Sequence, residues 1–179
     1  MLFSSKYLSP IGPLLLAGDG RKLVGLWMEG QKYFGASVTE TLVVNDALPL
    51  FAVVCEWLDE YFAGGRPAIE RLPLAPRGSD FRQAVWRRLC AIPYGTTLSY
   101  GEIATEVAAL LHKPGMSGQA VGGAVGHNPI SIIIPCHRVV GRDGSLTGYA
   151  GGLERKIRLL ELEGVRMERL YVPARGTAL

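Results

Sequence analysis

The amino-acid sequence predicts a mixed α/β (α+β) protein in two parts: a small antiparallel sheet with one helix, followed by a mainly helical part. Short apolar runs separated by turn residues fill the first 45 positions, which is typical of strands. From residue 79 onward, apolar residues recur at helical spacing instead. The stretch Gly65–Gly78 is rich in Pro, Gly and Arg and has no period, so we expect a linker there.

Two strands and a tight turn are predicted near the N-terminus. The apolar runs Leu14–Ala17 and Leu23–Met28 flank Asp19-Gly20, a strong turn signal. An amphipathic helix follows over about Ala47–Phe62, with Asp46 as its expected cap. Its apolar positions recur at the spacing of one helix face and are Leu50, Phe51, Val54, Trp57, Leu58 and Tyr61.

Three helices are predicted at the start of the second part. Ser79 or Asp80 caps the first of them, and Ser99–Glu102 has the spacing of a capping box that opens the second. Pro114-Gly115 breaks the chain, and Ser117 caps a third, short helix. Two helices joined by a Gly-containing turn form the pattern of a helix-turn-helix, which also occurs in proteins that do not bind DNA.

The chain after the third helix carries the residues of chemical interest. Ile130–Ile134 is β-branched and too short for a comfortable helix, so we expect a buried extended segment. Pro135–Arg138 follows directly. A Gly-rich loop over Gly141–Gly152 leads into a last helix of about Leu153–Leu162, with Gly164 at its end.

Composition and charge restrict the class of protein. A hydrophobic share of 48% and a charged share of 20% are typical of a soluble globular protein, and no apolar run is long enough to span a membrane. The first residues lack the pattern of a secretory signal, so an intracellular, cytoplasmic protein is expected. Residues 1–76 carry a net charge of −2 and residues 77–179 one of +5, which is compatible with a polyanionic partner without being specific for one.

Cys136 is the strongest candidate for a reactive group. The three cysteines, Cys55, Cys90 and Cys136, include no CxxC pair, which argues against a disulfide framework or a zinc site. Cys55 and Cys90 lie on apolar helix faces and are expected in the core. His137 and Arg138 follow Cys136, and positive neighbours lower the pKa of a thiol. For an arbitrary cysteine the alternative, a buried structural role, is the more common one, and the context Pro135–Val140 reverses that preference.

The hexapeptide Pro135–Val140 strongly resembles the active-site motif of the O6-alkylguanine-DNA alkyltransferases (methylated-DNA–protein-cysteine methyltransferases). The resemblance covers about residues 6–166 and is dense from residue 80 onward but thin over 30–75. The other segments similar to that family are Ser9–Leu14, Ile92–Gly95, Ser99–Ala104, Asn128-Pro129, Thr147–Gly152 and Leu160–Gly164.

The resemblance implies both a fold and a reaction. The N-terminal domain would be ribonuclease-H-like, and the C-terminal domain would carry the helix-turn-helix and the reactive cysteine. Cys136 would attack the carbon on guanine O6 and keep the alkyl group as a thioether. His137 would act as a base through a bridging water and be oriented by Glu163, which follows the nucleophile–base–orienter logic of covalent catalysis.

Further roles follow from the same resemblance. Tyr100 would supply a proton to the departing guanine, and Asn128 would tie the recognition helix to the active-site segment. The alkyl pocket would be shaped by Pro135, Val139, Tyr149, Ala150 and Gly151. Taken singly, each of the polar residues has an alternative reading: a satisfied core histidine, a surface aromatic, an exposed helix-end carboxylate or merely a residue before proline.

The third helix is expected to meet DNA. Each interior glycine costs about 1 kcal/mol relative to alanine, so a close approach should compensate, either to DNA or to a neighbouring helix. In the family this helix enters the minor groove, and an arginine fills the gap left by a base rotated out of the duplex. Gln119 stands at the arginine position here, after a loop a few residues longer than usual. The expected DNA-binding residues are Lys113, Gln119, Ala120, Gly122, Gly123 and Arg138.

The full expectation is a single-turnover transferase with three segments. They are residues 1–76 (N-terminal domain with linker), 77–168 (DNA-binding and transfer domain) and 169–179 (tail). No cofactor is implied, and no metal site, because the N-terminal part has no Cys/His cluster. The expected partner is double-stranded DNA with a flipped alkylated base; a monomer without membrane association is expected, and cooperative loading is left open. Two rivals are a non-catalytic lesion binder and a Cys-His hydrolase.

Overall fold

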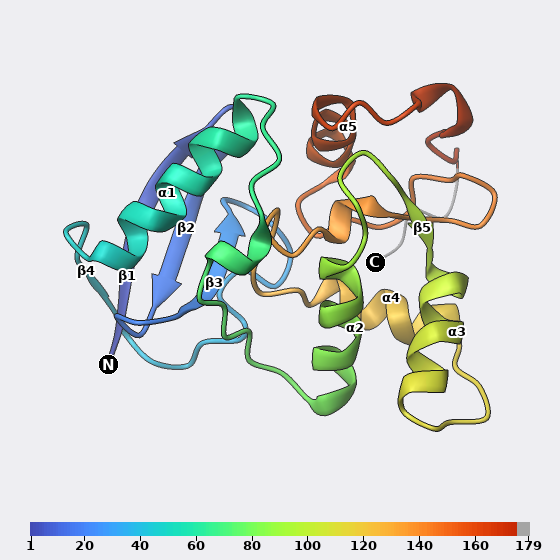
Figure 1. Ribbon diagram of the computed structural model, residues 1–179, viewed down its shortest axis with the longest axis horizontal. Helices are drawn as coiled ribbons and strands as arrows, with labels where there is room; N and C mark the ends of the chain where they lie inside the picture. The colour runs from blue at the N-terminus through green and yellow to red at the C-terminus, as the bar shows by residue number, and fades with distance from the viewer. Residues whose placement is uncertain (175–179) are drawn as a thin grey trace. The chain divides into compact units, whose positions relative to one another are not determined.

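The computed structural model describes residues 1–174, which form two compact units (Figure 1). The first unit holds Met1–Arg77 together with Pro129–Ile133, and the second holds Gly78–Asn128 and residues 134–174. The sequence-based boundary after residue 76 lies one residue from this division. Residues 129–133, expected in the second domain, belong to the first unit. The expected tail, 169–179, lies partly outside the described residues.

The first unit is built on a four-stranded sheet in the order β3-β2-β1-β4. The strands β1 (Leu2–Ser9), β2 (Gly12–Gly18) and β3 (Leu23–Met28) are antiparallel neighbours. The short strand β4 (Leu42–Val44) pairs with β1 in the parallel direction, so the expectation of a purely antiparallel sheet is wrong at this edge. The long connection from β3 allows this, because a parallel neighbour needs a crossover rather than a hairpin.

The helix α1 (Pro49–Phe62) lies on this sheet (Figure 1). Asp46 does not cap it: the preceding residue is Leu48, Pro49 stands at the first helical position, and the Asp46 carboxylate accepts a hydrogen bond of 2.6 Å from Ser5. Proline suits that position because its missing N–H would have no partner there. The buried residues of α1 are the six predicted from spacing, namely Leu50, Phe51, Val54, Trp57, Leu58 and Tyr61.

Among the described residues the second unit contains four α-helices, and caps were predicted for three of them: Ser79 or Asp80, Ser99 and Ser117. These three helices are α2 (Asp80–Cys90), α3 (Tyr100–Leu110) and α4 (Gly118–Gly126), and α5 (Leu153–Leu162) follows near the end of the unit. The structure selects Ser79 for the first helix and confirms the other two caps: Ser79, Ser99 and Ser117 each accept a bond from the main-chain N–H three residues later. Short segments complete the chain: η1 (Ile69–Arg71) in the first unit and β5 (Leu98–Ser99), η2 (Cys136–Arg138), β6 (Val139–Val140) and η3 (Met167–Arg169) in the second.

The isoleucine-rich segment is buried as expected but is not extended. Its residues form a turn, and Ile132 has a φ of 70°. Main-chain bonds join it to β3, from Leu26 N–H to the Pro129 carbonyl and from Ser131 N–H to the Leu26 carbonyl. A β-branched residue at positive φ is disfavoured by about 1–2 kcal/mol, so tertiary packing overrides local propensity here.

Two further expectations concern the burial of two cysteines and the presence of membrane-spanning helices. Cys55 and Cys90 are half-buried rather than core residues, since each stands at the margin of its helix's apolar face. Within residues 1–174, no helix is both long and apolar enough to cross a bilayer.

Candidate active site

Cys136 is held on a short 3-10 turn that the neighbouring strand pair anchors. The turn, η2, is followed at once by β6, which pairs with β5 in register Leu98↔Val139 and Ser99↔Val140. Ser99 is also the cap of α3, so the strand that fixes the reactive turn runs directly into the first helix of the helix-turn-helix. Cys136 is 4% exposed. Its position is therefore set by the main chain rather than by a flexible loop.

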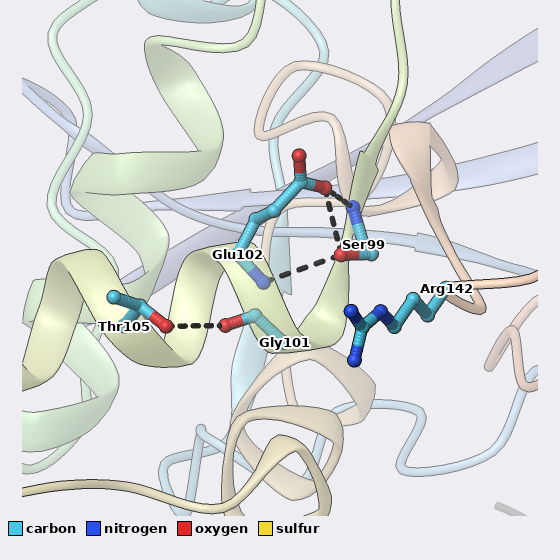
Figure 2. Close-up of a pocket in the computed structure, with 5 residues that line it drawn as sticks. All are labelled: Ser99, Gly101, Glu102, Thr105 and Arg142. Carbon is cyan, nitrogen blue, oxygen red and sulfur yellow. Dashed lines mark hydrogen bonds between the residues drawn. The ribbon is translucent and has the colours of Figure 1, made fainter.

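A capping box formed by Ser99 and Glu102 stabilises the first turn of α3 (Figure 2). Glu102 accepts from the Ser99 main-chain N–H and hydroxyl at 2.7 Å each, and the Ser99 hydroxyl accepts from Glu102 N–H. The pKa of Glu102 is lowered mainly by these hydrogen bonds, with smaller contributions from positive charges that include Arg142. In Figure 2 the Arg142 side chain points toward this helix start. The capping box fixes the helix that carries Tyr100.

Asn128 donates a hydrogen bond to the sulfur of Cys136. Its Nδ2 lies 3.1 Å from Cys136 Sγ and 2.8 Å from the carbonyl oxygen of Ile134, and the side chain is buried. Asn128 comes two residues after the last residue of α4, Gly126, so one amide links the end of that helix to the reactive turn. An amide N–H is a better partner for a thiolate than for a thiol, and the bond to sulfur had no sequence signal.

His137, Glu163 and Arg138 form a buried charged cluster behind the cysteine. His137 Nε2 lies 2.7 Å from Glu163 Oε1, and the Arg138 guanidinium donates to both carboxylate oxygens at 2.8 and 3.0 Å. Burial lowers the pKa of His137, whereas the pKa of Glu163 is lowered by His137 and Arg138 against the opposing effect of burial. The resting pair is thus a neutral imidazole beside a carboxylate. Because a carboxylate only accepts, the proton sits on Nε2 and Nδ1 is the basic nitrogen.

Cys136 rests as a thiol. Burial raises the pKa of Cys136, opposed by the hydrogen bond from Asn128 and by the charge of Lys156. The expectation that the side chains of His137 and Arg138 would lower this pKa is wrong, because the histidine is neutral and the arginine is bonded to Glu163 and to the carbonyl of Ile92 at 2.6 Å. His137 lowers the pKa only slightly, through its main-chain N–H. A thiolate must therefore be generated by an event that changes the site, such as substrate binding.

Tyr100 points from α3 to the loop after β6. Its hydroxyl donates toward the carbonyl oxygens of Thr147 at 3.1 Å and Gly148 at 3.2 Å. Burial raises the pKa of Tyr100, so the phenol keeps its proton at neutral pH. The remaining residues assigned to the alkyl pocket differ in burial: Pro135, Val139 and Tyr149 are buried, and Ala150 and Gly151 are half-buried.

The residues expected to meet DNA separate into two groups. Lys113, Gln119, Ala120 and Gly123 are exposed, and Gly122 is half-buried beside the Tyr100 ring. Arg138 does not belong with them. It is 6% exposed and its guanidinium is bonded to Glu163 and Ile92, so it cannot reach a phosphate without breaking the charged cluster.

Lys156 is the site residue that sequence reasoning missed. It is fully buried on α5, and its amine donates to three main-chain carbonyls near Cys136 and Tyr100. A signal was present: Lys156 lies three residues after Leu153 and four before Leu160, on the apolar face of the helix.

Comparison with known proteins gives one family for both units. The model of the 6-O-methylguanine DNA methyltransferase ribonuclease-like domain matches residues 2–76, and that of the DNA binding domain of the same family matches residues 80–165. The methylated-DNA–protein-cysteine methyltransferase of Mycobacterium tuberculosis is 49% identical over 158 residues, or 88% of this chain and 90% of that protein. The Haemophilus influenzae protein of the same name is 42% identical over 164 residues, or 92% of this chain and 87% of that protein.

Solved structures agree with the sequence comparison. The crystal structure of M. tuberculosis OGT in complex with DNA has a TM-score of 0.79 and 44% identity and covers 96% of each chain. The O6-methylguanine-DNA methyltransferase of Pyrococcus kodakaraensis has a TM-score of 0.63 and 26% identity, covering 92% of this chain and all of that one. With both family models matching and relatives near half identity over most of its length, the chain belongs to the methylated-DNA–protein-cysteine methyltransferase family.

Proposed function

We propose that this protein repairs DNA by moving the alkyl group of an O6-alkylguanine onto Cys136, once per molecule. The observation that carries the proposal is the buried thiol that accepts a bond from Asn128 and stands beside a neutral His137 paired with Glu163. This is a nucleophile with a base and a group that orients the base. The other two cysteines, Cys55 and Cys90, lie on helices α1 and α2, and a thioether is not readily cleaved, so we expect the reaction to be stoichiometric.

Activation begins with proton removal from the Cys136 thiol. The proton passes through a bridging water to Nδ1 of His137, and Glu163 stabilises the imidazolium that forms. Asn128 then donates its Nδ2–H to a thiolate. The thiolate forms a bond to the alkyl carbon while the bond from that carbon to guanine O6 breaks. His137 and Glu163 stabilise the charged, activated site more than the neutral resting site, and only such a difference in stabilisation accelerates a reaction.

Departure of guanine requires a proton, because its anion is a poor leaving group. Tyr100, whose hydroxyl is protonated and bonded to two carbonyls, donates this proton to the guanine. The proton that His137 took from the thiol then restores the phenol through solvent. The balance is one thiol proton exchanged for one alkyl group. Pro135, Val139, Tyr149, Ala150 and Gly151 shape the alkyl pocket.

The partner is double-stranded DNA, entered from the minor groove by α4 with the damaged base rotated out. Gly123 supports this: it is exposed, and a Cβ placed there would meet no neighbouring atom within 4 Å, so internal packing gives no reason for its missing side chain. Gln119, Ala120 and Lys113 are exposed on the same motif. The protein is expected to act as a monomer in the cytoplasm, where thiols stay reduced.

Intact-protein mass after incubation with duplex DNA carrying one O6-methylguanine tests the reaction. A stoichiometric gain of one methylene mass is expected, absent from Cys136→Ala. Peptide mapping should place it on Cys136 and not on the half-buried Cys55 or Cys90. DNA binding without a mass gain would indicate a lesion binder, and a transient acyl adduct would indicate a hydrolase; either outcome would refute the proposal.

A further inference from the structure

Lys156 is a fully buried lysine whose bonds all go to main-chain carbonyls. Its Nζ donates to the oxygens of Val139 at 2.6 Å, Thr147 at 3.0 Å and Gly148 at 3.4 Å. An ammonium has three N–H donors, so these bonds use all of them. Burial lowers the pKa of Lys156 to about 8, with the Cys136 sulfur acting in the opposite direction. A lysine buried without a carboxylate is uncommon and costly, and the transfer steps above leave it without a task.

Two of the three carbonyls are shared with Tyr100. The Tyr100 hydroxyl lies 3.1 Å from the oxygen of Thr147 and 3.2 Å from that of Gly148. A carbonyl oxygen has two lone pairs and can accept from both partners at once, whereas a hydroxyl has a single proton to give. The tyrosine cannot hold these carbonyls and donate to a departing base at the same time.

We propose that Lys156 is a positioning residue for alkyl transfer: it keeps the Thr147 and Gly148 carbonyls bonded when the Tyr100 hydroxyl turns away from them to the guanine. The inference rests on the proposed function, since it takes the proton-donor role of Tyr100 as given. Lys156 makes and breaks no covalent bond and keeps its own protons throughout.

The consequence is a lower cost for moving the tyrosine. Without the lysine, a hydroxyl that turns to the base would leave buried carbonyl oxygens with no donor, and an unmade hydrogen bond to a buried acceptor is costly. The hydroxyl would then stay on the loop. With the lysine in place, the loop that carries Tyr149 into the pocket also keeps its shape during the reaction.

A double-mutant cycle distinguishes this positioning role from a purely structural role of Lys156. Single-turnover methyl transfer from saturating O6-methylguanine duplex is measured for the parent, Lys156→Gln, Tyr100→Phe and the double variant. Each is also alkylated with iodoacetamide, whose iodide leaves without a proton and therefore does not need Tyr100. Arg158→Gln is the matched control, because it removes a positive charge from the exposed side of the same helix.

Lys156→Gln should slow methyl transfer by about 10- to 100-fold when Tyr100 is present, and by less than about threefold in the Tyr100→Phe background. Its loss with iodoacetamide should be smaller than its loss with the guanine substrate, and Arg158→Gln should match the parent. If Lys156→Gln does not fold, Lys156→Met, which keeps the side-chain length, takes its place in the same cycle.

Lys156→Gln could instead slow the reaction equally in the two Tyr100 backgrounds, or equally with iodoacetamide and with the guanine substrate. Either result would overturn the inference and indicate a purely structural role for Lys156. Failure of the parent itself to take up methyl from DNA would remove the proposed function, and this is visible before any variant is compared.

Discussion

Gly123 offers a substitution that should stabilise the protein and weaken its binding to DNA. It lies in the interior of α4, its φ is not positive, and a Cβ added there would have no neighbouring atom within 4 Å. Gly123→Ala therefore gains helix propensity without a clash, which is worth about 1 kcal/mol in unfolding free energy. For a protein of this size, that gain raises Tm by roughly 2–4 °C.

The expected effect on DNA has the opposite sign. If α4 enters the minor groove, a side chain at this position must occupy space between the helix backbone and the DNA. Overpacking a close contact costs about 1–3 kcal/mol, and about 1.4 kcal/mol corresponds to a tenfold change in Kd. We expect duplex binding to weaken by about tenfold for Gly123→Ala and by about 100-fold for Gly123→Leu.

The assay pairs thermal unfolding with fluorescence-anisotropy titration of an O6-methylguanine duplex at fixed salt, using Cys136→Ala as background to prevent reaction. Ala52→Leu is the control, because it places the same leucine side chain at an exposed position of α1 in the first unit. A Gly123→Leu variant that is as stable as the parent and binds duplex equally tightly would refute the placement of α4 in the groove.

Four other outcomes are expected, for Glu163, Cys136 and Gln119. Glu163→Gln removes the carboxylate that His137 and Arg138 share. Denaturant titration should show an unfolding free energy lower by about 3 kcal/mol. Single-turnover mass spectrometry should show methyl transfer slowed by at least about tenfold. Because the pKa of Glu163 is lowered in the folded protein, this carboxylate stabilises the fold fully above about pH 4.3, and the stabilisation is lost as the pH falls through the folded pKa. Glu163→Gln should lack this acid-dependent part of the unfolding free energy. An acid titration of stability that is the same in the variant and the parent would contradict the charged cluster. The raised pKa of Cys136 predicts that alkylation of the free protein by iodoacetamide still accelerates above about pH 8.5, whereas a plateau near neutral pH would show a preformed thiolate. Gln119→Arg should speed repair of duplex DNA relative to the free base, and an unchanged duplex rate would count against a weak flipping device.

Local signals in the sequence determined most of the helical framework. Ser99 and Ser117 cap their helices as predicted, Ser79 is one of the two candidates given for the first cap, and the six-residue apolar face of α1 follows from spacing alone. These features depend on residues three or four apart along the chain, so their physics is contained in a short window of sequence. The motif around Cys136 likewise sufficed to indicate the family, which the comparisons then established.

Tertiary structure decided what each group near Cys136 can do. Arg138 was expected to contact DNA and to activate the thiol, but its guanidinium forms an ion pair with Glu163, 25 residues away. The Cys136 thiol has a raised rather than a lowered pKa because burial outweighs the bond from Asn128. Ile132 adopts a left-handed turn against its β propensity. Burial, charge pairing and shared acceptors such as those of Lys156 depend on residues brought together only by folding, and no local pattern encodes them.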